Sequence, residues 1–208
     1  LYAAYHFAQL AIRNGLRPLI GTEANLFYEG RKIPFRLLAK NNQGYKNLIK
    51  LATELSSGQR EFTYFSDYLN DIALILPSED WEPGMSLGSE VFIGVRPEDA
   101  GKEFDYPVVP LHTVRYFENA DRSTIQTLHA ISQNVSLSEV SICPMNQLLF
   151  SAKEMEEAYS KLPEALNNLN QLVSDVSYQF DTNLKLPRFN REMPAVDQLR
   201  QLAQSGLD

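Results

Sequence analysis

The sequence contains little of what builds disulfide frameworks, zinc clusters or membrane spans. A single cysteine, Cys143, stands in 208 residues, which excludes an internal disulfide and any multi-cysteine zinc site and fits a reducing cytosol. No run of about 18 apolar residues is present, and the first ten residues lack the order of a signal peptide. We therefore expect a cytoplasmic protein that does not span or contact a membrane.

Positive charge is also scarce. The chain has 19 Lys and Arg against 26 Asp and Glu, which gives a formal net charge of -7 and a pI near 5.1. Broad nucleic-acid binding needs clustered Lys and Arg to contact phosphates. If the chain belongs to a DNA-processing machine, we expect other parts of that machine to hold the DNA.

The common catalytic motifs are missing as well. The sequence contains no G-x-S-x-G, P-loop, G-x-G-x-x-G or H-E-x-x-H pattern, which removes the usual nucleophile, nucleotide-binding and zincin interpretations. Two of the three histidines, His6 and His129, fall on helical patterns and are interpreted as packing or surface residues. The spacing of the histidines fits no metal motif.

The first part of the chain predicts alternating helices and strands. The fraction of hydrophobic residues, 44%, is enough for one large core, or for a core with a helical appendage. A helix over Tyr2–Asn14 precedes a strand over Pro18–Phe27, a polar turn around Gly30 and a second strand over Ile33–Ala39, so a hairpin is expected. A helix follows, with Asn41 or Asn42 as its cap.

Three short apolar segments, DIALILP, EVFIGV and YPVVPL, predict further strands. The spacer between the last two is shorter than a crossover helix needs, so we expect that a segment has been trimmed there. Helices are predicted over 118–132, from Ser151 with Glu154 in capping-box spacing, and from Pro163. The predicted class is therefore α/β, with a mostly helical last third.

Two residues at predicted strand ends are candidate metal ligands. Glu23 follows the segment PLIG and His112 follows YPVVPL, and neighbouring strand ends could bring the two onto one divalent cation. A catalytic metal site normally needs three or more protein ligands, so each residue is weighed against a purely structural role. Four acids in polar segments that are predicted to be loops are interpreted as solvated side chains: Asp67, Asp71, Glu79 and Asp80.

Four stretches together resemble a known family. In order and spacing, GLRPLIGTE, LLAKNNQGYKNLIKLATELSS, YPVVPLHTVRYF and SAKEMEEAYSKLPEALNNLNQLV are similar to the polymerase-and-histidinol-phosphatase (PHP) domain at the N-terminus of bacterial DNA polymerase III alpha subunits of the DnaE type. The most specific stretch is LLAKNNQGYKNLIKL. The resemblance covers most of the chain and is least clear from about residue 59 to residue 105.

The resemblance implies a fold and a domain division. It implies part of a distorted PHP-type α/β barrel, followed by a helical segment, in an N-terminally truncated fragment that lacks the opening strands and their histidine motifs. Residues 1–183 would form the PHP-like domain. Residues 184–208 would form a linker and the start of the polymerase palm region, so that polymerase catalysis and its Mg²⁺ would belong to the parent chain and no cofactor to this fragment.

Departures from the family pattern decide the metal question. Family members that keep a metal site have His at the place of Pro34, an acid at the place of Gly94, and Asn-Asp-x-His where this chain has His112, Thr113, Val114 and Arg115. Arg115 would repel a divalent ion by about 1 to 4 kcal/mol per unit charge at roughly 4 Å. Only Glu23 matches a family ligand. The resemblance therefore implies a vestigial, metal-free site without catalytic residues, in which His112 is a bystander.

Three functions are weighed. The first is a structural and interaction module within a replicative DNA polymerase alpha subunit, whose parent chain performs DNA-directed DNA synthesis. Its implied partners are the palm and thumb domains of the same chain, a proofreading exonuclease subunit, or other replisome proteins. The second is a metal-dependent phosphoesterase or proofreading 3'-5' exonuclease, in which Glu23, His112 and ligands from before Leu1 hold metal ions that clamp the phosphate oxygens. The third is an unrelated α/β domain.

Overall fold

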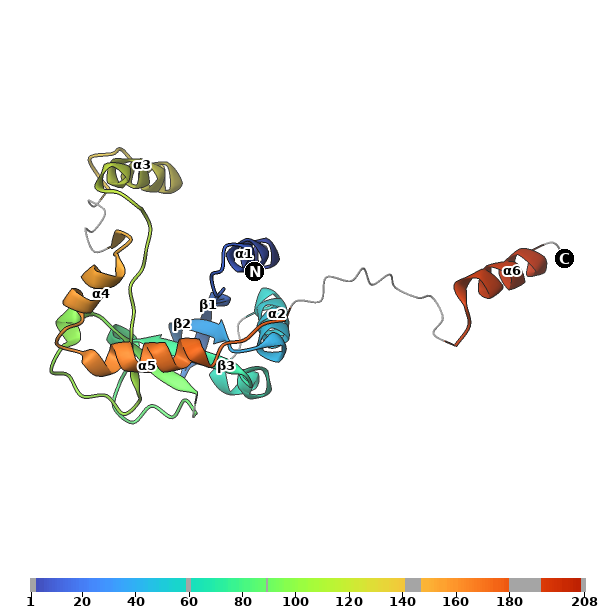
Figure 1. Ribbon diagram of the computed structural model, residues 1–208, viewed down its shortest axis with the longest axis horizontal. Helices are drawn as coiled ribbons and strands as arrows, with labels where there is room; N and C mark the ends of the chain where they lie inside the picture. Colours follow the sequence, from blue (N-terminus) through green and yellow to red (C-terminus); the bar gives the residue numbers. More distant parts are fainter. Residues whose placement is uncertain (1–2, 59–60, 89, 141–146, 180–191, 207–208) are drawn as a thin grey trace.

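A computed structural model describes residues 3–58, 61–88, 90–140, 147–179 and 192–206 of the chain. Its centre is one five-stranded mixed sheet in the order β1-β2-β3-β4-β5, with helices around it (Figure 1). The predicted α/β class is thus confirmed. The sheet is open among the described residues, with β1 and β5 at its two edges, so the barrel that the resemblance implies is not closed here.

The N-terminal part forms a helix and a hairpin, as predicted. Helix α1 (Ala4–Arg13) precedes strands β1 (Gly21–Tyr28) and β2 (Arg31–Ala39), which pair antiparallel from Gly21 opposite Leu38 to Tyr28 opposite Arg31. The two turn residues, Glu29 and Gly30, have φ values of 50° and 76°. Two positive φ values in a two-residue loop match the twist of the flanking strands, and glycine adopts such a φ without strain. The first strand begins at Gly21, three residues later than the predicted start at Pro18.

Helix α2 (Asn42–Ser56) covers this hairpin. The side chain of Asn41 is its cap, because Oδ1 accepts the backbone N–H groups of Gln43 at 2.8 Å and Gly44 at 3.0 Å. The choice between Asn41 and Asn42 is settled in favour of Asn41. Leu48 and Leu51 on the inner face of α2 are fully buried. A short 3-10 helix, η1 (Phe62–Tyr68), adds the buried rings of Phe62 and Phe65 and was not predicted.

The second half of the sheet is parallel. Strand β3 (Ile72–Pro77) pairs antiparallel with β2, whereas β4 (Val91–Val95) and β5 (Val108–Pro110) continue from it in parallel. Two 3-10 turns, η2 (Ser78–Asp80) and η3 (Pro97–Asp99), follow β3 and β4. Residues 96–107 between β4 and β5, all of which are described, contain no crossover helix, as the short spacer predicted.

The last third is helical. It contains η4 (Asn119–Asp121), α3 (Arg122–Gln133), α4 (Ala152–Ala158), α5 (Pro163–Ser174) and α6 (Ala195–Ser205). The predicted capping box begins α4, since Ser151 Oγ accepts the N–H of Glu154 and the Glu154 carboxylate accepts the N–H of Ser151. The predicted boundary between residues 183 and 184 lies outside the described residues, as does Cys143.

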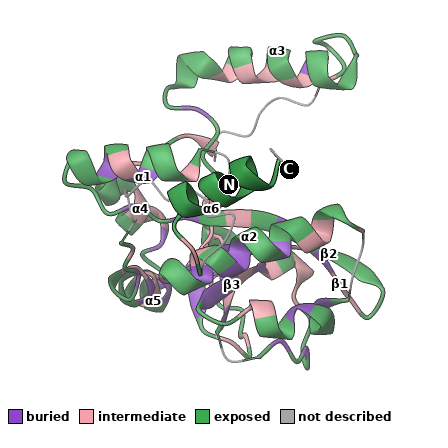
Figure 2. Ribbon diagram, turned by 90° about the vertical axis from the view of Figure 1, so that its right-hand side faces the viewer, coloured by how far each residue is buried: buried purple, intermediate pink, exposed green. Residues whose placement is uncertain are grey.

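The core lies mainly on one face of the sheet. Strand residues such as Phe35, Leu37, Leu74 and Ile93 pack there in one cluster with the inner residues of α2 and η1. The opposite face carries a smaller cluster, in which Leu172 of α5 joins side chains of the central strands. Buried residues concentrate around β3 and the inward side of α2, while α3 is mostly exposed (Figure 2). In the part of the chain that the structure describes, no helix is long and apolar enough to cross a membrane.

Candidate functional site

Three of the predicted site positions share one face of the sheet. Glu23 lies opposite Arg36 in the β1–β2 pair, Pro34 is two residues from Arg36 on the same strand, and Arg36 lies opposite Ile75. Gly94 of β4 lies beside Pro77, two residues from Ile75 on β3. Because residues directly opposite across strands point the same way and alternate residues share a face, these side chains lie on one side. We call this side, with Glu23, Pro34, Arg36, Ile75 and Gly94, the site face.

Glu23 is engaged by a cation on the next strand. Glu23 lies inside β1, so the prediction that Glu23 follows a strand was wrong. The strand continues through this residue because the hairpin register pairs Glu23 with Arg36. Its Oε2 is 3.1 Å from Nη2 of Arg36, and Nη1 of Arg36 donates to the carbonyl oxygen of Pro34 at 3.1 Å. The Glu23 side chain is 56% exposed, so the pair contributes little to stability. It does place a positive charge against the acid that the resemblance singles out.

Gly94 has no space for a side chain. A Cβ atom built at this position would lie 2.9 Å from Cβ and Cδ2 of Leu111 and 3.0 Å from Cγ2 of Ile75. Contacts this short require the neighbouring side chains to move. Leu111 and Ile75 thus fill the space on the site face that an acid at position 94 would need.

The residues after β5 leave the sheet. The Leu111 N–H still donates to the carbonyl oxygen of Val95, whereas Thr113 and Arg115 are exposed and the Arg115 N–H donates to the Gln147 carbonyl oxygen at 2.9 Å. The His112 ring turns to the non-helical segment that precedes α4. Its Nε2 lies 2.7 Å from the carbonyl oxygen of Leu148, and its ring stacks on Phe150 with centroids 4.4 Å apart.

Glu23 and His112 are not brought together in the sheet. The two residues were expected on neighbouring strand ends, but β1 and β5 are the opposite edges of the sheet and three strands lie between them. The prediction was wrong because local sequence patterns do not reveal the order of strands in a sheet. Across the described ranges, no group of three His, Cys, Asp or Glu side chains is placed to hold a metal ion.

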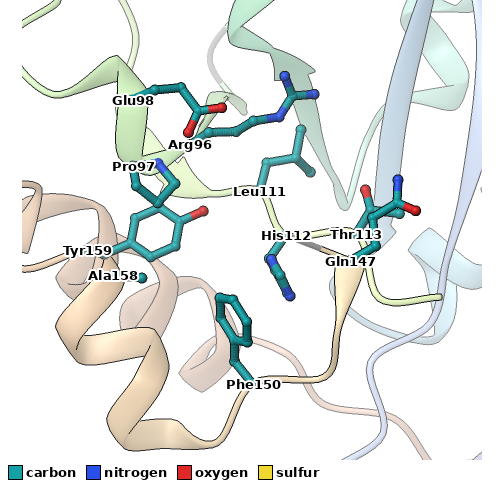
Figure 3. A pocket seen from close by; sticks show the side chains of 10 residues that line it. All are labelled: Arg96, Pro97, Glu98, Leu111, His112, Thr113, Gln147, Phe150, Ala158 and Tyr159. Atoms are coloured by element: carbon teal, nitrogen blue, oxygen red, sulfur yellow. The ribbon is translucent and has the colours of Figure 1, made fainter. Parts of the chain in front are cut away.

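A cavity of about 440 Å³ lies at the carboxyl ends of β4 and β5, against α4. Figure 3 shows the rings of Tyr159, Phe150 and His112 around it, with Pro97 beside Tyr159 and Glu98 above Pro97. The Tyr159 hydroxyl donates to the carbonyl oxygen of Val95 at 3.1 Å. Burial, and then the nearby Glu98 carboxylate, raise the pKa of Tyr159 to about 12.

Sequence reasoning identified only part of this cavity. It singled out His112 and Thr113 but missed Phe150 and Tyr159, which lie just before and just after α4. Only the position of these two aromatic residues at the ends of the predicted helix could have pointed to them. The four loop acids lie elsewhere: Asp67 and Asp71 are exposed, Glu79 pairs with Arg96 at 2.6 Å, and burial raises the pKa of the half-buried Asp80.

Comparison with known proteins gives related chains along the whole sequence. A family model for the PHP domain matches residues 1–82. The DNA polymerase III subunit alpha of Streptococcus pyogenes serotype M1 is 40% identical over 210 residues, which cover 100% of this chain and 20% of the relative. The subunit of Bacillus subtilis is 27% identical over 204 residues, covering 80% of this chain and 18% of the relative.

A third relative is longer in this region. The DNA polymerase III subunit alpha of Halalkalibacterium halodurans is 25% identical over 245 residues, covering 99% of this chain and 22% of the relative. Because 245 exceeds the 208 residues of this chain, that relative has segments that this chain lacks. The chain spans about a fifth of the length of the curated relatives that it matches.

Proposed function

We propose, because this chain carries a PHP domain and is homologous over its whole length to bacterial DNA polymerase III alpha subunits, a role within such a polymerase. In this role the chain serves as a structural and interaction module and holds no metal ion. The observation that carries the proposal is the ion pair between Glu23 and Arg36, 3.1 Å long, on the site face. A divalent cation at Glu23 would have to displace the guanidinium or bind beside it, and like charges in contact repel strongly.

The other positions of the site face support the same conclusion. Pro34 has no side-chain donor atom for a metal, and the space beside Gly94 is filled by Leu111 and Ile75. Thr113 and Arg115 would offer a neutral hydroxyl and a second cation. Fewer than three ligands remain, which is below what a catalytic site normally uses.

The proposed interactions are with other parts of a polymerase. Helices α1, α3 and α6 expose large apolar side chains, among them Leu10 at 58%, Ile131 at 70% and Leu199 at 69%. Such side chains are typical of surfaces that pack against another domain or subunit. We propose that they contact the palm and thumb of the parent chain, with a proofreading exonuclease subunit or other replisome proteins as further partners.

The remaining roles belong to the parent chain. We propose that a full-length relative of this segment carries out DNA-directed DNA synthesis in the cytoplasm with Mg²⁺, and that the DNA is held outside this segment. The net charge of -7 supports the last point, because phosphate contacts need positive charge. Two finer proposals follow from the resemblance: the open sheet is part of a distorted PHP-type barrel, and residues 184–208 link it to the palm.

An activity assay tests the proposal against the metal-dependent alternative. The full-length polymerase chain that contains this segment is incubated with single-stranded DNA and a phosphodiester substrate, in the presence of Mn²⁺ or Zn²⁺. We expect no hydrolysis that depends on Glu23. Hydrolysis that Glu23→Gln abolishes, and that the matched variant Glu29→Gln leaves intact, would establish a phosphoesterase or proofreading exonuclease instead.

A further inference from the structure

The cavity between α4 and the carboxyl ends of β4 and β5 has features that the proposed function does not use. We propose that this cavity binds a primary alkylammonium group. The cavity differs from the site face, because the stacked rings of His112 and Phe150 that line it lie outside that face, although Leu111 borders both the cavity and Gly94.

The walls of the cavity are aromatic. The rings of Tyr159, Phe150 and His112 stand on three sides of it (Figure 3). Aromatic faces carry partial negative charge and attract an ammonium group, more strongly where water is excluded. Tyr159 is 1% exposed and its hydroxyl is fixed on Val95, so this wall is rigid and its ring is already desolvated.

The charge at the rim favours a cation over an anion. Arg96 is the one cationic side chain in the lining, and its guanidinium is already paired with Glu79 at 2.6 Å. Glu98 also lines the cavity, and within the described part of the chain it forms no ion pair. Its carboxylate therefore remains as the net charge facing the cavity.

His112 supplies a hydrogen-bond acceptor. A carbonyl oxygen can only accept, so the Nε2 atom that lies 2.7 Å from the Leu148 oxygen carries the proton. In the neutral ring, Nδ1 is then an acceptor. A primary ammonium has three N–H groups and can donate one to this nitrogen, whereas a quaternary ammonium has none, so this acceptor favours a primary over a quaternary amine. The cavity of about 440 Å³ accommodates such a group together with its alkyl chain.

Titration followed by nuclear magnetic resonance tests the proposal. Butylammonium and its neutral counterpart 1-butanol are added to the chain and the amide signals of Thr113 and Ala158 are followed. We expect saturable shifts with butylammonium and at least about tenfold weaker binding of butanol. Glu98→Gln and Phe150→Leu should each weaken butylammonium binding about tenfold, whereas Glu103→Gln on the same connection should not change it.

The outcomes separate the proposal from a general apolar pocket. Three results would overturn it: equal binding of butanol, no saturable shift at the cavity, or an equal effect of Glu98→Gln and Glu103→Gln. Because Glu98 is exposed, Glu98→Gln tests the site even if the Phe150→Leu variant unfolds. Spermidine and Nα-acetyl-lysine methylamide distinguish the source. Tighter binding of spermidine indicates a free polyamine, tighter binding of the lysine compound indicates a lysine of a protein partner, and failure of both contradicts the proposal.

Discussion

At the scale of single residues, the absence of a side chain at position 94 shapes the site face. Leu111 and Ile75 reach over Gly94 and make the contacts that a side chain there would otherwise occupy. The strand remains buried and tightly packed as a result, with Ile93 and Val95 fully buried on the opposite face. Placing an acid at this position would therefore require the neighbouring side chains to change as well.

Gly94→Ala is expected to destabilise the protein by about 1 to 3 kcal/mol, because overpacking forces neighbours out of their rotamers. The measurement is chemical unfolding of the variant and the parent. Leu111→Ala removes one of the two crowding side chains, so Gly94→Ala should cost less in that background. The same cost in both backgrounds would show that Leu111 does not cause the crowding.

Leu48→Ala is expected to cost about 2 to 5 kcal/mol, because Leu48 is fully buried in the main core and its loss leaves a cavity. Ile49→Ala is the matched control, since the neighbouring Ile49 is 44% exposed on the same helix. Chemical unfolding should separate the two variants clearly. Equal effects would mean that the inner face of α2 is assigned incorrectly.

Residue-level features could be predicted where they depend on local spacing. The Ser151–Glu154 capping box and the cap near Asn41 follow from a few consecutive residues, and both are present. The partner of Glu23 could not be predicted, because it depends on the hairpin register that sets Glu23 opposite Arg36. The aromatic wall of Phe150 and Tyr159 depends on how α4 docks, which no local pattern encodes.

At the scale of elements, the connection between β4 and β5 is a short turn held around one buried acid. Asp99 is 3% exposed and accepts hydrogen bonds from Ser78 Oγ at 2.6 Å, the Arg96 N–H at 2.9 Å and Lys102 Nζ at 2.7 Å. Burial alone would raise the pKa of Asp99, but these three hydrogen bonds outweigh it, and the pKa lies below its usual value of 3.8.

Asp99→Ala is expected to destabilise the protein by about 1.5 to 3 kcal/mol at neutral pH, because hydrogen bonds to a charged acceptor are lost. A carboxylate with a lowered pKa stabilises the fold above the unfolded-state pKa, and this contribution is lost as pH falls through the lower folded-state pKa. The difference between Asp99→Ala and the parent should therefore shrink below pH 3.8. Exposed Glu103→Ala should show no such trend in acid unfolding, and a pH-independent difference for Asp99→Ala would contradict the assignment.

The sequence predicted most elements but not their arrangement. Apolar periodicity and turn residues located the hairpin, α2, β3 and α5, since each depends on consecutive residues. The order of the strands depends on contacts between distant segments, so the separation of Glu23 and His112 on opposite edges was missed. Helix η1 was missed because its seven residues are too few to establish a helical period.

At the scale of the whole molecule, the main feature is that the folded segment leaves apolar side chains exposed to solvent. Helix α6 has no buried residue, and Val196, Leu199 and Leu202 are 63%, 69% and 59% exposed along it. A helix with one apolar face gains most of its stability from packing on a partner. In a longer polymerase chain, we expect this face to be covered.

Leu199→Glu together with Leu202→Glu is expected to lower the thermal unfolding midpoint of the full-length chain by several degrees, because charges would be placed in a buried contact. In the 208-residue segment the same pair should have little effect, since both positions are exposed. Gln201→Glu with Gln204→Glu adds equal charge on the other side of α6 and serves as the control. A full-length chain that tolerates the leucine pair as well as the glutamine pair would contradict a covered face.

The account as a whole depends on the site face being unable to gather a divalent cation. Calorimetric titration of Mn²⁺ and Zn²⁺ into the full-length chain that contains this segment, made as the parent protein and as Glu23→Gln, tests this most directly. The account predicts that Glu23→Gln leaves the number and affinity of bound ions unchanged, because Glu23 is already held by Arg36. Saturable binding of one or two ions that disappears in Glu23→Gln would contradict it.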